Sequence, residues 1–161
     1  DIHEGIDSTL LILHNRLKAK LNHPGIEVIK RYSSLPKVDC YAGQLNQAFM
    51  NILANAIDSL DDEVNKNHNF NPQIIISTEL SLSNIKIRIA DNGSGIPFSI
   101  QSKLFDPFFT TKQVGKGTGL GLSSSYQIIV DKHHGKLSFD SSPGEGTEFI
   151  IEIPIKQCSS T

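Results

Sequence analysis

The sequence predicts an α+β fold in which helices cover one face of a mixed β-sheet. The chain has 161 residues, which is the length of one domain. Its β-rich runs come in pairs, and helical segments separate the pairs. Segment 43–63 carries apolar residues at helical spacing over its whole length, which makes it the clearest helix. We therefore expect a single domain, 1–161, with a helical layer on a sheet.

The first half of the chain predicts two helices and two strands. Residues 6–20 repeat apolar side chains three and four apart, which is the spacing of a helix. A turn precedes a strand at 26–32, and Pro36 bounds a second, short strand at 37–41. The helix 43–63 follows directly.

The second half predicts a hairpin, a long loop, a third helix and a second hairpin. A short polar turn joins the β-rich runs 73–80 and 85–90. Residues 97–117 hold two prolines and glycine–lysine pairs, which predict a long loop. A helix is expected at 118–134, followed by strands at 136–140 and 147–153.

The composition excludes several classes of protein. With 15 basic and 17 acidic residues the net charge is −2, which argues against nucleic-acid binding. No apolar run approaches the roughly 18 residues of a membrane span, so no membrane contact is expected. Cys40 and Cys158 fit no metal spacing and are expected to be free thiols in a reducing compartment, the cytoplasm. The chain lacks an initiator Met, so we expect a fragment of a longer protein, either membrane-anchored or soluble.

A polar stripe runs along the helix 43–63. Gln47, Asn51, Asn55 and Asp58 follow one another at steps of four, four and three, which places them on one face. Asn is a mediocre helix former, so two of them four apart are locally unfavourable. The stripe is either a solvated face or a wall of amide oxygens that faces a ligand. Such oxygens suit Mg²⁺, which takes its other ligands from water and phosphates.

Two glycine-containing segments are candidates for ligand binding. In 91–95, Gly93 and Gly95 allow the backbone to approach a flat ligand closely, and Asp91 can accept a hydrogen bond from an adenine amino group. A surface turn is the alternative for this segment. Segment 115–122 opens the helix 118–134, where backbone N–H groups bind anions, with a flexible hinge as the alternative.

Five motifs occur in a fixed order and resemble those of one family. They span 47–56, 91–97, 104–112, 117–122 and 144–149, and resemble the N, G1, F and G2 boxes and the trailing Gly-x-Gly-Thr strand. Together they resemble the catalytic and ATP-binding domain of bacterial sensor histidine kinases, in the superfamily shared with gyrase, Hsp90 and MutL. The resemblance implies a Bergerat-type two-layer α/β sandwich, with about five strands, about three helices on one face and an ATP lid at 97–117.

The resemblance also implies a role for each site residue. Asp91 would receive the adenine amino group, with Thr147 supporting the base through a water. Asn55 would hold Mg²⁺, while Asn51 and Lys112 would act beside the phosphates as the catalytic residues. The implied cofactor-binding residues are Asn51, Asn55, Asp91, Gly93, Gly95, Ile96, Lys112, Gly117, Thr118, Gly119, Leu120, Gly121, Leu122 and Thr147.

The implied function is transfer of the γ-phosphoryl group of Mg-ATP to a histidine on a separate dimerisation domain, within two-component signal transduction. That domain would lie upstream, so the fragment is expected to be monomeric, the parent kinase a homodimer, and the response regulator an indirect partner. The alternatives are an ATPase or conformational clamp of the same superfamily, and a module that binds without chemistry. Asn51 speaks against hydrolysis, because ATPase members carry a Glu there as general base and an amide cannot take a proton from water.

Three positions invite other interpretations. Asp58 stands where many sensor kinases carry a basic residue, which would leave the phosphate charge more dependent on Mg²⁺ and the lid lysines. His3 precedes Glu4 as in a phosphoacceptor pair, but the rest of that motif is absent, so His3 is not expected to accept phosphate. His133 and His134 lack a third metal ligand and are expected to act as cations near a helix C-terminus.

Overall fold

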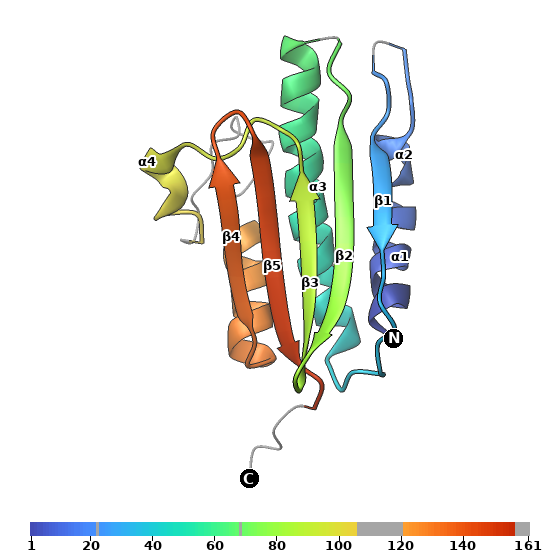
Figure 1. The fold of residues 1–161 in the computed structure, drawn as a ribbon, viewed down its shortest axis with the longest axis vertical. Coiled ribbons are helices and arrows are strands. Elements are labelled where there is room, and N and C mark those ends of the chain that lie inside the picture. The colour runs from blue at the N-terminus through green and yellow to red at the C-terminus, as the bar shows by residue number, and fades with distance from the viewer. Residues whose placement is uncertain (22, 68, 106–120, 157–161) are drawn as a thin grey trace.

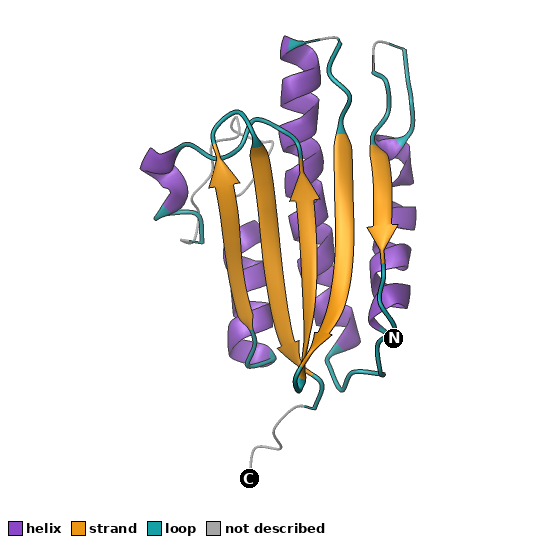
Figure 2. Cartoon of the chain, viewed as in Figure 1, coloured by secondary structure: helices purple, strands orange, loops and turns teal. Residues whose placement is uncertain are grey.

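The computed structural model describes residues 1–21, 23–67, 69–105 and 121–156. Five strands form one layer in the order β1-β2-β3-β5-β4, and the long helices form a second layer on one face of this sheet (Figures 1 and 2). Strand β1 pairs with β2 in parallel, and all other neighbours are antiparallel. The predicted α+β sandwich with a mixed sheet is therefore confirmed.

Most elements follow the predicted order with changed boundaries, but the predicted strand 37–41 is absent and the predicted loop 97–117 contains a short helix at 98–101. The helices are α1 (Ile2–Ile12), α2 (His14–Leu17), α3 (Ala42–Lys66), α4 (Phe98–Gln101) and α5 (Gly121–Tyr126), which continues as the π-helix η1 (Gln127–Lys132). The strands are β1 (Glu27–Arg31), β2 (Gln73–Ser81), β3 (Asn84–Asp91), β4 (Lys136–Ser142) and β5 (Gly146–Pro154).

Two predictions from the first half of the chain are wrong. The segment 37–41 is not a strand: it belongs to the connection that leads from β1 to α3, and the Asp39 N–H donates to the carbonyl of Ile155 at 2.8 Å. The expected helix 6–20 begins earlier, because the Asp1 side chain caps α1 by accepting hydrogen bonds from the backbone N–H groups of His3 and Glu4. It also breaks at Leu13, so α1 and α2 are separate.

The core lies between the sheet and α3. Alternate residues of β3 and β5, and of β2 as far as Thr78, are buried, which is the period of a strand with one covered face. From α3, nine residues are buried: Leu45, Ala48, Phe49, Ile52, Leu53, Ala56, Ile57, Leu60 and Val64. Among the described residues, no helix is long and apolar enough to cross a membrane.

Candidate functional site

The buried alternation of β3 ends on a carboxylate. Ile85, Ile87 and Ile89 face the helices, and Asp91 occupies the next position of the same row with 9% of its surface exposed. The Gly93 N–H donates to Asp91 Oδ1 at 2.9 Å, and the backbone of Thr147 also bonds the carboxylate. Burial nevertheless raises the pKa of Asp91 to about 6, because desolvation outweighs these two hydrogen bonds. Asp91 places a carboxylate at a buried position where the rest of the row has isoleucine. This marks the end of β3 as a candidate site.

The raised pKa of Asp91 predicts how stability depends on pH. Because the folded value lies above the ordinary 3.8, the folded state binds a proton at Asp91 more tightly than the unfolded chain does, and the contribution of Asp91 to stability rises as pH falls from about 7 toward 4. Relative to the Asp91→Asn variant, the unsubstituted chain should gain about 1 kcal/mol of unfolding free energy when the pH is lowered from 7 to 5. Urea unfolding of both proteins at the two pH values measures this gain, and a constant difference would contradict the raised pKa.

Two glycines bring separate elements against the turn after Asp91. A Cβ atom at Gly93 would collide with Ser59 of α3. Gly95 has a φ of +75°, and a Cβ there would collide with the carbonyl oxygen of Ser142 at the end of β4. The turn 91–95 therefore packs against α3 on one side and against the β4–β5 hairpin on the other.

The Thr147 hydroxyl is paired with that of Ser141, a residue that the sequence analysis did not predict. Ser141 Oγ accepts from the Ile96 N–H at 2.8 Å and donates to the Gly146 carbonyl at 3.1 Å, and it lies 2.9 Å from Thr147 Oγ1. Since Ser141 has one hydroxyl proton, the Thr147 hydroxyl donates to Ser141 and keeps its lone pairs as acceptors. The available signal was the inward row of β4, in which Leu137 and Phe139 are followed by a serine.

The polar stripe of α3 divides into two parts. Gln47 Nε2 donates to Asn51 Oδ1 at 3.0 Å, and Asn51 lies beside Gly121, where α5 begins. The Asn55 amide is half-exposed and has no hydrogen-bond partner among the described residues. Asp58, in contrast, bonds Arg16 of α2 at 2.6 Å. The charge of Asp58 is thus balanced by a cation from outside the motif.

Of the predicted lid 97–117, only the first part, as far as Phe105, lies within the described residues. Lys112, Gly117, Thr118, Gly119 and Leu120 lie outside the described residues, whereas Gly121 and Leu122 form the first residues of α5. In the described part, the ring centroid of Phe105 lies 5.3 Å from that of Tyr126 in α5 and 5.8 Å from that of Phe139 in β4. Phe105 therefore anchors the first part of the predicted lid against α5 and β4.

His3 and His133 are both engaged in contacts within the fold. His3 Nε2 lies 2.8 Å from Thr78 Oγ1, and the His3 ring stacks on Tyr32 at 4.1 Å. His133 is not the expected cation at a helix end: it is fully buried, and its Nε2 accepts the Tyr41 N–H at 3.0 Å, which requires an unprotonated nitrogen. In the part of the chain that the structure describes, no three His, Cys, Asp or Glu side chains gather to hold a metal.

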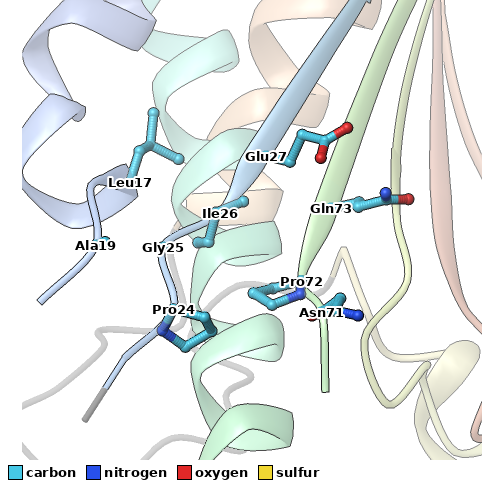
Figure 3. A pocket seen from close by; sticks show the side chains of 9 residues that line it. All are labelled: Leu17, Ala19, Pro24, Gly25, Ile26, Glu27, Asn71, Pro72 and Gln73. Carbon is cyan, nitrogen blue, oxygen red and sulfur yellow. The ribbon is translucent and has the colours of Figure 1, made fainter. Parts of the chain in front are cut away.

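A separate pocket of about 440 Å³ lies beside β1 and the start of β2 (Figure 3). Leu17 lies on one side of β1, and Glu27 points to the other side, so its carboxylate does not face Leu17. Asn92 links this region to the site, because its side chain accepts from the Gln73 N–H at 2.8 Å and donates to the Asn71 carbonyl at 3.0 Å. We assign this pocket no ligand.

The sequence of this chain is similar to those of known proteins. The family model for histidine kinase-, DNA gyrase B- and HSP90-like ATPases matches residues 41–157. Sporulation kinase E of Bacillus subtilis is 34% identical over 143 residues, which cover 88% of this chain and 18% of that kinase. The chain thus spans less than a fifth of the length of this curated relative.

Solved structures agree with the sequence comparison. The nucleotide-free catalytic domain of the histidine kinase ThkA superposes with a TM-score of 0.78 at 29% identity, covering 96% of this chain and 95% of that one. ThkA in complex with the response regulator TrrA matches with a TM-score of 0.74 at 26% identity, covering 96% of this chain and 40% of that chain.

Proposed function

Because the chain belongs to the family of histidine kinase-, DNA gyrase B- and HSP90-like ATPases, we propose that it is the ATP-binding catalytic domain of a sensor histidine kinase. The observation that carries this proposal is the buried Asp91 carboxylate, flanked by the Gly93–Gly95 turn and the Thr147 hydroxyl. A buried acceptor beside a polar hydroxyl suits the amino edge of an adenine ring, because the amino group donates hydrogen bonds.

The residues near the expected phosphates fit a magnesium ion. Mg²⁺ usually takes one or two protein oxygens and completes its shell with water and phosphate. Asn55 offers an amide oxygen with no partner in the described part of the chain, and Asn51 lies one turn before it on the same face. When bound, the ion would neutralise charge on the phosphates. Lys112 and the backbone of 117–122 would contact the phosphates, a role supported by the motif resemblance alone.

The proposed reaction is transfer of the γ-phosphoryl group to a histidine on the dimerisation domain of the same kinase. The domain's own residues bind and orient ATP, so most of the rate enhancement comes from positioning and charge stabilisation. Asn51 disfavours hydrolysis, because an amide does not accept a proton from water. The phosphohistidine would then pass its phosphoryl group to a response regulator. The related kinase ThkA has been solved in complex with such a protein, TrrA. We place this chemistry in the cytoplasm, within a homodimeric parent kinase.

The isolated chain is expected to bind Mg-ATP without phosphorylating itself. His3 contacts Thr78 and Tyr32, and His133 is buried with its Nε2 bonded to a backbone N–H, so neither presents a nitrogen to the γ-phosphorus. Adding a second protein that carries the parent's dimerisation helices should restore labelling, more slowly than in the intact kinase because the encounter is bimolecular.

Radiolabelled ATP tests this expectation. Acid-labile, base-stable counts should appear on the added helices only. Stoichiometric label on this chain that disappears in His3→Ala would contradict the proposed acceptor, and rapid phosphate release by this chain alone would favour an ATPase.

Asn55→Ala is expected to weaken binding of Mg-ADP more than binding of ADP without metal. The amide oxygen contacts the metal and contributes little to recognition of the base. Titration calorimetry with and without Mg²⁺ measures the ratio, and Asn46→Ala, a half-exposed position on another face of α3, is the matched control. Equal losses in both conditions would show that Asn55 serves the fold instead.

A further inference from the structure

We propose that His133 is a positioning residue of the nucleotide site, acting as a neutral latch between the end of η1 and the start of α3. The inference rests on the proposed function, because it concerns the same site. His133 does not touch the expected nucleotide; it would act through the spacing of the two helices that flank the phosphates.

The contacts of His133 define its protonation state. The ring has no exposed surface, its Nδ1 lies 2.7 Å from the Ile128 carbonyl oxygen, and its Nε2 lies 3.0 Å from the Tyr41 nitrogen. A carbonyl oxygen only accepts and a backbone N–H only donates, so Nδ1 carries the proton and Nε2 is bare. The imidazole is therefore neutral, and both ring nitrogens are used.

The Tyr41 contact ties His133 to the beginning of α3. Tyr41 is the N-cap of α3, and its carbonyl accepts the Leu45 N–H at 2.9 Å, but its side chain makes no capping hydrogen bond. The Tyr41 ring meets the imidazole edge to face, with centroids 5.5 Å apart. His133 thus holds the residue from which α3 starts.

The Ile128 contact ties the same ring to η1. A π-helix is a rare element that is found frequently at functional sites. The six residues of η1 run into His133, and the Gly135 N–H donates back to the Ile129 carbonyl at 2.8 Å. One imidazole therefore joins the end of one helix to the start of the other.

The proposed site lies at the other end of the α5–η1 segment and within α3, away from its start. The segment α5–η1 runs antiparallel beside α3 (Figure 1), beginning at Gly121 next to Asn51 and ending at His133 next to Tyr41. Asn51 is ten positions after Tyr41, or about 15 Å along the helix. Because helices are stiff, a slip at His133 displaces the start of α5 relative to Asn51 and Asn55. A misplacement of about 1 Å can cost about 100-fold in the rate of a reaction that depends on positioned groups, so the contacts to the phosphates should be sensitive to this spacing as well.

Three variants of His133 separate its two hydrogen bonds. His133→Phe keeps a ring and removes both bonds, and we expect Mg-ATP affinity to fall about tenfold, since the competent arrangement is then only fractionally populated. His133→Gln can place an amide oxygen where Nε2 stands, accept from Tyr41, and retain affinity within about threefold. His133→Asn can donate to Ile128 but does not reach Tyr41, so it should resemble the Phe variant.

Calorimetric affinities and melting temperatures, measured on the whole chain, decide the matter. A latch predicts that Gln binds better than Asn, whereas a purely local role in ending η1 predicts the reverse. Ile129→Val is the matched control, because Ile129 is fully buried in the same π-helix. It should lower the melting temperature and leave affinity within twofold.

Each outcome bears on the proposal. Affinity that follows the melting temperature across all four variants, or that stays unchanged in His133→Phe, overturns the latch while leaving nucleotide binding intact. If the unsubstituted chain binds no ATP, the proposed function is overturned and the latch with it. Nitrogen NMR of the unliganded protein gives a readout without nucleotide: a protonated Nδ1 on His133 supports the latch, and a protonated Nε2 overturns it.

Discussion

Asp91→Asn is expected to weaken ATP binding about 5- to 150-fold while the domain stays folded. The substitution replaces one acceptor oxygen with a donor amide that would face the amino group of the proposed adenine ligand, and an unpaired buried polar group costs about 1–3 kcal/mol. The fold should tolerate the change, because the carboxylate is already unfavourable where it lies: burial raises the pKa of Asp91 to about 6. Loss of affinity without loss of stability is the signature of a residue kept for its ligand.

Calorimetric titration with ATP measures this loss, with thermal unfolding of the unliganded protein beside it. Asp140→Asn makes the same chemical change at an exposed position of β4 and should leave affinity within twofold. Unchanged affinity in Asp91→Asn would place the adenine pocket elsewhere.

Gly95→Ala is expected to destabilise the unliganded domain by about 3 kcal/mol. Two effects combine: a side chain at a positive φ of +75° is strained by about 1 kcal/mol, and the new Cβ collides with the Ser142 carbonyl oxygen. Backbone cannot yield as a flexible side chain can, so the turn and the β4–β5 hairpin must separate. The hydrogen bond of the Gly144 N–H to the Ser94 carbonyl joins the same two segments and would weaken with them.

Gly144→Ala separates these two effects. Gly144 has a φ of +82°, but a Cβ there meets nothing within 4 Å. This variant should therefore lose only about 1 kcal/mol, the strain alone. Urea unfolding of both variants gives the comparison. Equal losses would mean that the close approach at Gly95 contributes nothing, and ATP affinity should fall only in Gly95→Ala.

Patterns local to one element predicted most of the fold. The alternation in 85–90 and the helical spacing in 43–63 each reflect one covered face, so period and length were enough to find β3 and α3. The segment 37–41 has strand-like residues but was misassigned, because joining a sheet depends on where the preceding element ends. Its backbone contact to Ile155 comes from the other end of the chain.

The site was predicted where its residues sit in short motifs, and missed where contacts cross the chain. Asp91, Gly93 and Gly95 form one turn, and the structure brings Thr147 beside them. Ser141 was missed because its role depends on the register of β4 with β5. Arg16 bonds Asp58, which is 42 positions away in the sequence, and His133 bonds Tyr41, which is 92 positions away. Helix and strand periodicities predict no contacts between residues so far apart in the sequence. The roles of the site residues stay predictions until the variants above are measured.

The pairing of Asp91 with Thr147 also constrains how the protein folds. These residues face each other across β3 and β5, and 55 residues of chain lie between them. Closing so long a loop carries an entropic cost of several kcal/mol that only the assembled sheet repays, and such non-local pairings slow folding. The proposed adenine pocket therefore has no local precursor: neither hairpin contains it, and a partly folded chain lacks it. A ligand of this pocket would recognise only the finished sheet, so it would slow unfolding without speeding folding.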